Sequence, residues 1–251
     1  MKHLVPSSLL CVLLIPSIAF GVELHDLVKR DGRFYEKRWL DRVERVVLFS
    51  FIKKFTAVPF TGEVTGTERG SLREGKQDGP WTSYHDNGQL QWQGTYRNGQ
   101  REGPWVEYHE NGRLWQKGNV KEGTQDGPWV WYHENGQLQQ TGTVKDGERD
   151  GPWVAYDDNG QLKWKGTYNN RQKKGPWVWY HENGQLAKKG TFKGGQREGS
   201  WVWYGENGQL RSKGPYKDGR KDGAWVWYYD HGKLEWTGTY HEGKKDGPWL
   251  V

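Results

Sequence analysis

From residue 81 onward, aromatic and polar positions recur with a fixed period. A Trp returns every 24 residues, and a Tyr follows it three positions later in each complete unit. A short aromatic and β-branched run such as "PWVWY" leads to "ENG" or "DNG", and a second run such as "QLQQTGTV" follows. Strand-forming runs around turn residues predict one β-hairpin per unit. The repeated residues are Trp81, Trp105, Trp129, Trp153, Trp177, Trp201, Trp225 and Trp249.

The repeated units predict an all-β fold: an elongated single-layer antiparallel β-meander of 24-residue hairpin repeats over residues 59–251. A second turn such as "KDGERDG" links each hairpin to the next. A helical array is excluded because each unit contains three or four glycines. Each of these would cost about 1 kcal/mol in a helix interior.

The Asn-Gly pair sets the predicted strand register. If Asn135 and Gly136 form a two-residue type I′ turn, Trp129 lies opposite Gly142. The missing side chain of that glycine leaves space for the Trp indole to lie over the backbone. A longer loop would reverse the assignment of side chains to the two faces. The face predicted for Trp129 also carries Trp131, Leu138, Gly142 and Val144.

Residues 1–21 differ from the rest of the chain. Basic residues precede an apolar run over 9–15, and small residues follow. This pattern predicts a signal peptide cleaved after Ala19 or Gly21, which would remove Cys11. We therefore expect an exported protein that is periplasmic, associated with the cell envelope or secreted. With no cysteine left, the mature chain would contain no disulfide.

Residues 22–58 precede the repeats and are expected to cap the first edge of the sheet. Within them, "KRWLDRVERVVLFSFIKKF" at 37–55 places Leu40, Val43 and Val47 at helical spacing, which predicts a short helix. Basic residues flank these apolar positions, so an amphipathic segment on a membrane surface is the alternative. No stretch after residue 21 is long and apolar enough to span a bilayer.

Composition narrows the class of protein. The chain combines a mean hydropathy of -1.05 with 17 Trp residues, which argues against both a disordered chain and an ordinary globular core. Its 37 basic and 31 acidic residues give a formal charge of +6, and the two signs alternate within short loops. Such mixing is typical of a soluble surface and not of a nucleic-acid-binding patch.

The sequence contains no recognisable catalytic or metal site. His85, His109, His133 and His181 each follow a Trp by four positions. Residues one unit apart lie two strands apart, about 9–10 Å, whereas the ligands of one zinc ion lie within about 2.1 Å of it. The His series is therefore expected to be polar residues beside the hairpin loop. Acidic residues recur once per unit and form no isolated acid-base pair. We expect no enzyme activity, no metal and no cofactor.

The full repeat, "G-x-W-x-x-Y-x-x-N-G-x-L" with two further spaced glycines, resembles the bacterial variant of the MORN repeat over about residues 59–251. The segment "KKFTAVPFTGEVTG" at 53–66 is similar to the lead-in of the YwqK family of predicted antitoxins. There an "RDG-aromatic-Tyr" element runs almost straight into this lead-in, whereas here about sixteen residues intervene, which indicates an insertion. The resemblance implies an elongated sheet, a role in scaffolding, self-association or lipid contact, and no catalytic residues.

The expected function is that of an exported, non-enzymatic, elongated scaffold for protein interaction in the cell envelope. The second Trp of the motif is replaced by Ser83, Glu107 and Ala155 in three units, and this variation marks a candidate partner-binding stretch. Two alternatives stay open: a carbohydrate or peptidoglycan binding module that uses exposed Trp and Tyr, and an antitoxin or immunity protein that binds a toxin. The partner is an unknown protein or a second copy, with glycan or membrane-surface contact as further options and nucleic acid not expected. The candidate partner-binding residues are Trp131, Trp179, Trp203 and Trp227.

Overall fold

The computed structural model describes residues 22–23, 27–30, 33–36 and 59–250. These residues form twenty strands of one sheet and a separate two-stranded sheet, β2 with β3. The strands are β1 Val22–Glu23, β2 Leu27–Arg30, β3 Arg33–Glu36, β4 Gly62–Thr65, β5 Glu68–Arg73, β6 Lys76–Tyr84, β7 Leu90–Arg97, β8 Gln100–Tyr108, β9 Leu114–Lys121, β10 Thr124–Gln125, β11 Gly127–Tyr132, β12 Leu138–Lys145, β13 Glu148–Tyr156, β14 Leu162–Asn169, β15 Gln172–Tyr180, β16 Leu186–Lys193, β17 Gln196–Tyr204, β18 Leu210–Lys217, β19 Arg220–Lys221, β20 Gly223–Tyr228, β21 Leu234–His241 and β22 Lys244–Leu250.

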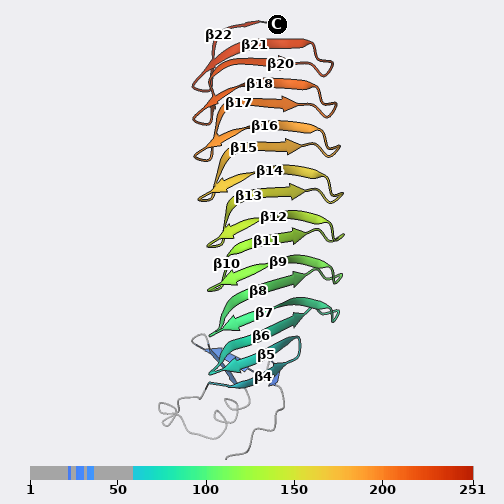
Figure 1. The fold of residues 1–251 in the computed structure, drawn as a ribbon, viewed down its shortest axis with the longest axis vertical. Helices are drawn as coiled ribbons and strands as arrows, with labels where there is room; N and C mark the ends of the chain where they lie inside the picture. Colours follow the sequence, from blue (N-terminus) through green and yellow to red (C-terminus); the bar gives the residue numbers. More distant parts are fainter. Residues whose placement is uncertain (1–21, 24–26, 31–32, 37–58, 251) are drawn as a thin grey trace, which may run out of the picture.

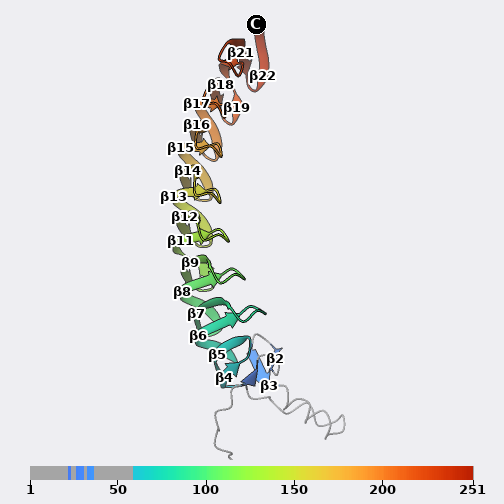
Figure 2. The same cartoon turned by 90° about the vertical axis from the view of Figure 1, so that its right-hand side faces the viewer.

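The large sheet is a single layer that runs the length of the molecule (Figure 1). Its strands from β4 onward pair antiparallel with their neighbours along the chain, and β1 adds in parallel to β4. Figure 2 shows the same row of hairpins edge-on as a gently curved column. The prediction of an elongated antiparallel meander of 24-residue hairpins is confirmed. Among the described residues, no helix is long and apolar enough to cross a bilayer.

The two-residue turn predicted at the Asn-Gly end of the hairpin occurs instead at its other end. At the Asn-Gly end, the His133 N–H donates to the Gln137 carbonyl oxygen at 2.9 Å, and the Gly136 N–H donates to the His133 carbonyl oxygen at 2.8 Å. These bonds close a three-residue loop, in which Gly136 has a φ of 88°. The two-residue type I′ geometry occurs at the Asp-Gly end, where Asp146 and Gly147 have φ values of 51° and 80°.

The predicted register is nevertheless confirmed from Gly127 to Trp131. It is wrong at Leu138, which is paired with Tyr132 and therefore does not share the face of Trp129 as predicted. Trp129 is paired with Gly142, and Trp131 is paired with Gln140. A bulge between Trp131 and Tyr132 absorbs the extra loop residue, so the body of the hairpin keeps its predicted pairing.

The Trp indole lies over a different glycine from the predicted one. A Cβ added to Gly118 would meet the Trp129 ring, whereas a Cβ added to Gly142 would meet the Trp153 ring. Each repeated Trp therefore covers the glycine of the preceding hairpin. Trp129 is buried, and its Nε1–H donates to the Asn119 carbonyl oxygen at 2.9 Å. The same bond to the preceding hairpin is made by Trp81, Trp153, Trp177, Trp201 and Trp225. The Trp row is thus both the core and the link between hairpins.

Aliphatic and aromatic side chains close the N-terminal end of the Trp row. Val64 and Leu72 are buried beside the first Trp, and Phe34 and Phe60 pack against them. The Gly75 N–H donates to the Phe60 carbonyl oxygen at 2.6 Å, and the Phe34 N–H donates to the Gly75 carbonyl oxygen at 2.6 Å. The separate β2–β3 hairpin is therefore tied to the first turn of the large sheet.

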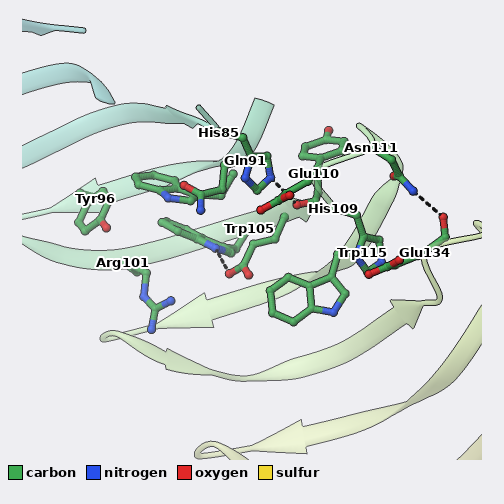
Figure 3. A pocket seen from close by; sticks show the side chains of 13 residues that line it. His85, Gln91, Tyr96, Arg101, Trp105, His109, Glu110, Asn111, Trp115 and Glu134 are labelled. Atoms are coloured by element: carbon green, nitrogen blue, oxygen red, sulfur yellow. Dashed lines mark hydrogen bonds between the residues drawn. The ribbon is translucent and has the colours of Figure 1, made fainter. Parts of the chain in front are cut away.

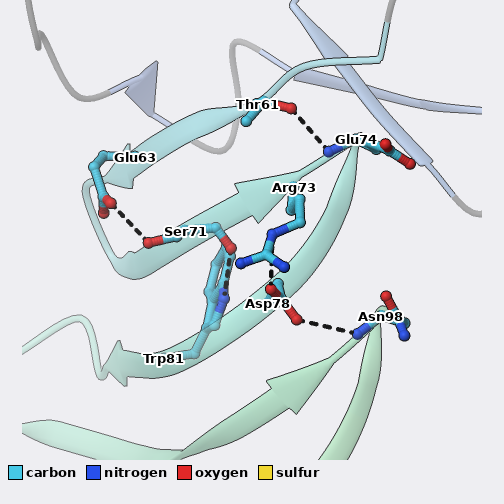
Figure 4. A network of polar contacts seen from close by, with 8 residues as sticks. All are labelled: Thr61, Glu63, Ser71, Arg73, Glu74, Asp78, Trp81 and Asn98. Atoms are coloured by element: carbon cyan, nitrogen blue, oxygen red, sulfur yellow. Dashed lines mark hydrogen bonds and ion pairs between the residues drawn. The ribbon is translucent and has the colours of Figure 1, made fainter.

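Polar side chains support the same end of the sheet (Figure 4). The Ser71 hydroxyl donates to the Glu63 carboxylate at 2.7 Å. The Thr61 hydroxyl accepts a bond from the Glu74 N–H at 2.8 Å. These contacts lock β4 and β5 together beside the first full hairpin.

Several predictions concern residues outside the described ranges, which exclude 1–21, 24–26, 31–32, 37–58 and 251. The signal peptide, the loss of Cys11 and the helix within 37–55 remain predictions. β1 belongs to the segment expected to cap the sheet. It lies at the first edge of the large sheet, where Val22 is paired with Val64.

Candidate functional site

The second-Trp positions lie in one cross-strand row. Directly paired residues of antiparallel strands share a face, so this row lies on what we call the Trp face, the face that carries the buried Trp residues. The structure brings all four candidate Trp residues into this row, and each is half-buried. In chain order, the row contains Ser83, Trp92, Glu107, Gln116, Trp131, Gln140, Ala155, Trp164, Trp179, Lys188, Trp203, Ser212, Trp227 and Trp236.

Two of the three units without a second Trp have a Trp on the opposite strand instead. Ser83 is paired with Trp92, and Ala155 is paired with Trp164. Both of these Trp rings stack on the buried Trp of the next hairpin, with centroids 4.9 and 5.3 Å apart. Variation at this position is therefore largely compensated within each hairpin. The third unit is the exception, because Glu107 is paired with Gln116 and neither strand brings a Trp to this position.

The Trp face also carries a cation over the rings of most hairpins. Lys173 Nζ lies 4.6 Å from the ring centroid of Trp177 and 5.3 Å from that of Trp179. Lys221 Nζ lies 4.2 Å from the ring centroid of Trp225. These distances are within the range of cation–π interaction. The complete series, which we call the cation row, contains Arg101, Arg149, Lys173, Arg197, Lys221 and Lys245.

The central part of the cation row carries uncompensated positive charge. Burial, and then the charges of Lys188, Arg197 and Arg149, lower the pKa of Lys173. Burial, and then Arg197, lower the pKa values of Lys188 and Lys221. None of these three lysines forms an ion pair with a described residue. A bound anion would relieve this mutual repulsion.

A cavity of about 660 Å³ opens on the Trp face beside the hairpin of β8 and β9, where the second Trp is missing (Figure 3). The Glu107 carboxylate lines it and accepts two bonds, from Trp105 Nε1–H at 2.8 Å and from the Gln116 amide at 2.8 Å. Trp105 thus bonds to a side chain of its own strand, unlike the other bonded members of the Trp row. Trp115, which is 41% exposed, also lines the cavity.

The repeat that builds this face matches a known family. The family described as "MORN repeat variant" matches seven consecutive segments, which together make up more than half of the chain. The chain belongs to this family. The matched segments are 77–98, 101–122, 125–146, 149–170, 173–193, 197–218 and 221–242.

Among solved structures, this MORN repeat variant protein is similar to a chain of "Crystal Structure of TcdB2-TccC3-Cdc42". The identity is 12% and the TM-score is 0.19. The match covers 74% of this chain and 12% of that chain. No curated protein matches the chain significantly.

Within the MORN repeats, the His series links neighbouring hairpins, a contact that the sequence did not predict. His133 Nε2 lies 3.1 Å from the Tyr156 carbonyl oxygen in the next hairpin. Asn135 Nδ2 donates to the Asp158 carbonyl oxygen of the same next loop. Within the described ranges, no group of three or more His, Cys, Asp or Glu side chains is placed to hold a metal ion. The His contact recurs at His85, His109 and His181.

Proposed function

We propose that this protein is an exported, non-enzymatic scaffold of the cell envelope that binds an extended acidic segment of a protein partner along its Trp face. The observation that carries the proposal is the cation row from Arg149 to Lys245, which has no paired carboxylate among the described residues. Half-buried Trp rings support these cations and hold them on one surface. Charge complementarity of this kind favours association with an acidic partner.

The spacing of the cation row supports an extended partner. Each hairpin adds two strands, so successive cations lie about 9–10 Å apart. A polyproline II chain has three residues per turn and advances about 9 Å per turn. Acidic side chains at every third residue of such a chain would face successive cations. A segment of roughly ten residues would therefore contact four hairpins.

The test uses two synthetic peptides, (Glu-Pro-Pro)4 and (Gln-Pro-Pro)4, whose binding is measured by fluorescence anisotropy. The glutamate peptide is expected to bind, with an affinity that falls as salt rises. A triple variant, Lys173→Met with Arg197→Met and Lys221→Met, should bind it at least about tenfold more weakly, since it removes three adjacent charge contacts.

The control variant makes the same change of charge outside the cation row, and its residues are the exposed Lys145, Lys193 and Lys217. Each is replaced by Met, and circular dichroism checks that both variants fold. Equal weakening by the two triple variants, or equal binding of the two peptides, would refute the proposal.

A glycan-binding module is less well supported by the Trp face. A sugar ring stacks on an open aromatic face, but a cation of the cation row lies over the rings of Trp179, Trp203 and Trp227. Trp131 differs, because Gln125 stands at the position of the cation in its hairpin. If the protein binds glycan strands, Trp131→Ala should weaken that binding more than Trp227→Ala does.

A second proposal rests on the resemblance to the YwqK family of predicted antitoxins. In it, the protein is an antitoxin or immunity protein, and its partner is a toxin. An immunity role outside the cytoplasm is compatible with the predicted export. This proposal requires a stable one-to-one complex with the product of a neighbouring gene, which size-exclusion chromatography of the coexpressed pair would test.

A further inference from the structure

The cavity beside Glu107 differs in chemistry from the rest of the Trp face. Each of the other hairpins contributes at least one Trp to the cross-strand row, but between Trp92 and Trp131 the row contains only Glu107 and Gln116. Gln116 is 8% exposed, so its amide is held inside the sheet surface, where it bonds to Glu107 Oε2. The hairpin has therefore replaced an aromatic ring with a positioned carboxylate.

No described cation neutralises this carboxylate. In a later hairpin, the Arg149 guanidinium reaches the row and bonds to Gln140 at 2.7 Å. The residue at the equivalent position next to Gln116 is Gln125, which carries no charge. Arg101 lies at the cavity, but it bonds to the Gly123 carbonyl oxygen at 3.3 Å and forms no ion pair with the described carboxylates.

Aromatic rings form the walls around the carboxylate. The rings of Trp92 and Trp105 stack at 4.9 Å, and Tyr96 meets the Trp105 ring edge-on at 5.6 Å. Trp115 lines the outer side and is 6.1 Å from the His109 ring. Figure 3 shows Tyr96, Trp105, His109 and Trp115 among the side chains that line the cavity. Aromatic walls with one carboxylate are the arrangement that recognises ammonium groups, because ring faces and the anion both attract a poorly hydrated cation.

We propose that this cavity binds an ammonium group, either unmodified or methylated, carried by a small amine or by a lysine side chain of a partner. The Glu107 carboxylate supplies the ionic contact, and the rings of Trp92 and Trp115 supply cation–π contacts. Trp105 is 3% exposed and already has Arg101 over its ring, so its part is to hold the carboxylate in place through its Nε1–H bond. The exposed carboxylates of Glu110 and Glu134, which also line the cavity, add to its negative potential. Arg101 is the opposing charge. The site shares only Arg101 with the cation row and takes a ligand of the opposite charge.

The inference is tested by titrating the full chain with two cations, tetramethylammonium chloride and Nα-acetyl-lysinamide. Trp fluorescence reports their binding. tert-Butanol serves as the neutral probe of similar shape. Glu107→Gln removes the charge but leaves an oxygen to accept the Trp105 Nε1–H bond, so the hairpin is expected to fold. Glu122→Gln makes the same change at the exposed turn that follows β9. Gln116→Trp fills the cavity with the residue type that Trp92 and Trp164 bring to the same position.

We expect at least one of the two cations to bind the wild type. Its affinity should be at least about tenfold lower for Glu107→Gln and for Gln116→Trp, and it should be unchanged for Glu122→Gln. Tetramethylammonium binding would identify a small amine as a sufficient ligand, whereas binding of lysinamide alone would indicate a side chain of a partner. The inference is overturned if tert-butanol binds as well as the cations, if Glu107→Gln binds like the wild type, or if neither cation binds at about 10 mM. Binding of (Glu-Pro-Pro)4 should be unaffected by Glu107→Gln, so failure of this site and failure of the proposed scaffold function are distinguishable.

Discussion

Replacing Gly142 by Ala tests the contact on which the core of the array depends. A Cβ on Gly142 would lie less than 3.0 Å from three atoms of the Trp153 ring, whereas ordinary van der Waals contact starts at 3.4 Å. The ring cannot turn aside easily, because Trp153 is 3% exposed and its Nε1–H is bonded to Thr143 at 3.0 Å. The indole must therefore lift from the sheet.

The expected cost follows from this displacement. Overpacking by one methyl group costs about 1–3 kcal/mol, so Gly142→Ala should lower the free energy of unfolding by that amount. The larger Gly142→Val should lift the indole further. Complete loss of the burial of a Trp of about 200 Å² sets an upper limit near 5 kcal/mol.

Urea unfolding followed by Trp fluorescence measures both effects. Gln139→Val, on the same strand, is the control and should change the free energy of unfolding by no more than about 0.5 kcal/mol, because the Gln139 side chain makes no hydrogen bond within the described residues. Double-mutant cycles should couple Gly142→Ala with Trp153→Phe more strongly than with Trp129→Phe. A neutral Gly142→Ala, or stronger coupling to Trp129, would refute the assignment of this glycine to the Trp of the following hairpin.

Three further predictions concern the turns and the charges. Arg171, at a φ of 68°, stands where most units have a left-handed Gly, so Arg171→Gly should raise the free energy of unfolding by about 1 kcal/mol in urea titrations; no gain would contradict the strain. Asn135→Ala should speed amide exchange in the loop of the hairpin that follows it, and Asn159→Ala should have a smaller effect on the loop that follows Asn159. Of these two residues, only Asn135 donates a bond to the following loop, so equal effects would contradict the link. The pKa of Lys173 is lowered in the fold, so below the ordinary value of 10.5 the folded chain loses this proton before the unfolded chain does, and stability should rise as the pH approaches that value. Lys173→Met should reduce this slope in thermal melts at several pH values, and an unchanged slope would contradict the cause.

The predicted pairing of Trp129 with Gly142 follows from placing a two-residue turn at Asn135 and Gly136, and the period carries the same pairing to every unit. The loop type could not be predicted, since an Asn-Gly pair suits both a two-residue and a three-residue loop. The bulge beside Tyr132 gives the three-residue loop the same pairing that a two-residue loop has without a bulge. The glycine that the indole covers could not be predicted either, because Gly118 and Gly142 are both one strand away from Trp129.

The candidate Trp residues were correctly placed on one face, but the sequence did not indicate what lies over them. Arg or Lys recurs four positions before most Trp residues, and this period was a usable signal that the mixed charge of the loops concealed. The cavity had a weaker signal. Glu107 was visible as a departure from Trp, but only its pairing with Gln116 shows that no ring from the opposite strand replaces it.

The direction of the strands sets the mechanical behaviour of the array. The strands lie across the long axis of the molecule (Figure 1), so tension between its ends acts along the inter-strand hydrogen bonds and not across them. Bonds loaded in this way open one strand at a time from an end, and each hairpin contributes only its contacts with two neighbours. The array should therefore peel open from an end under low tension. Such behaviour suits a spacer more than a tether.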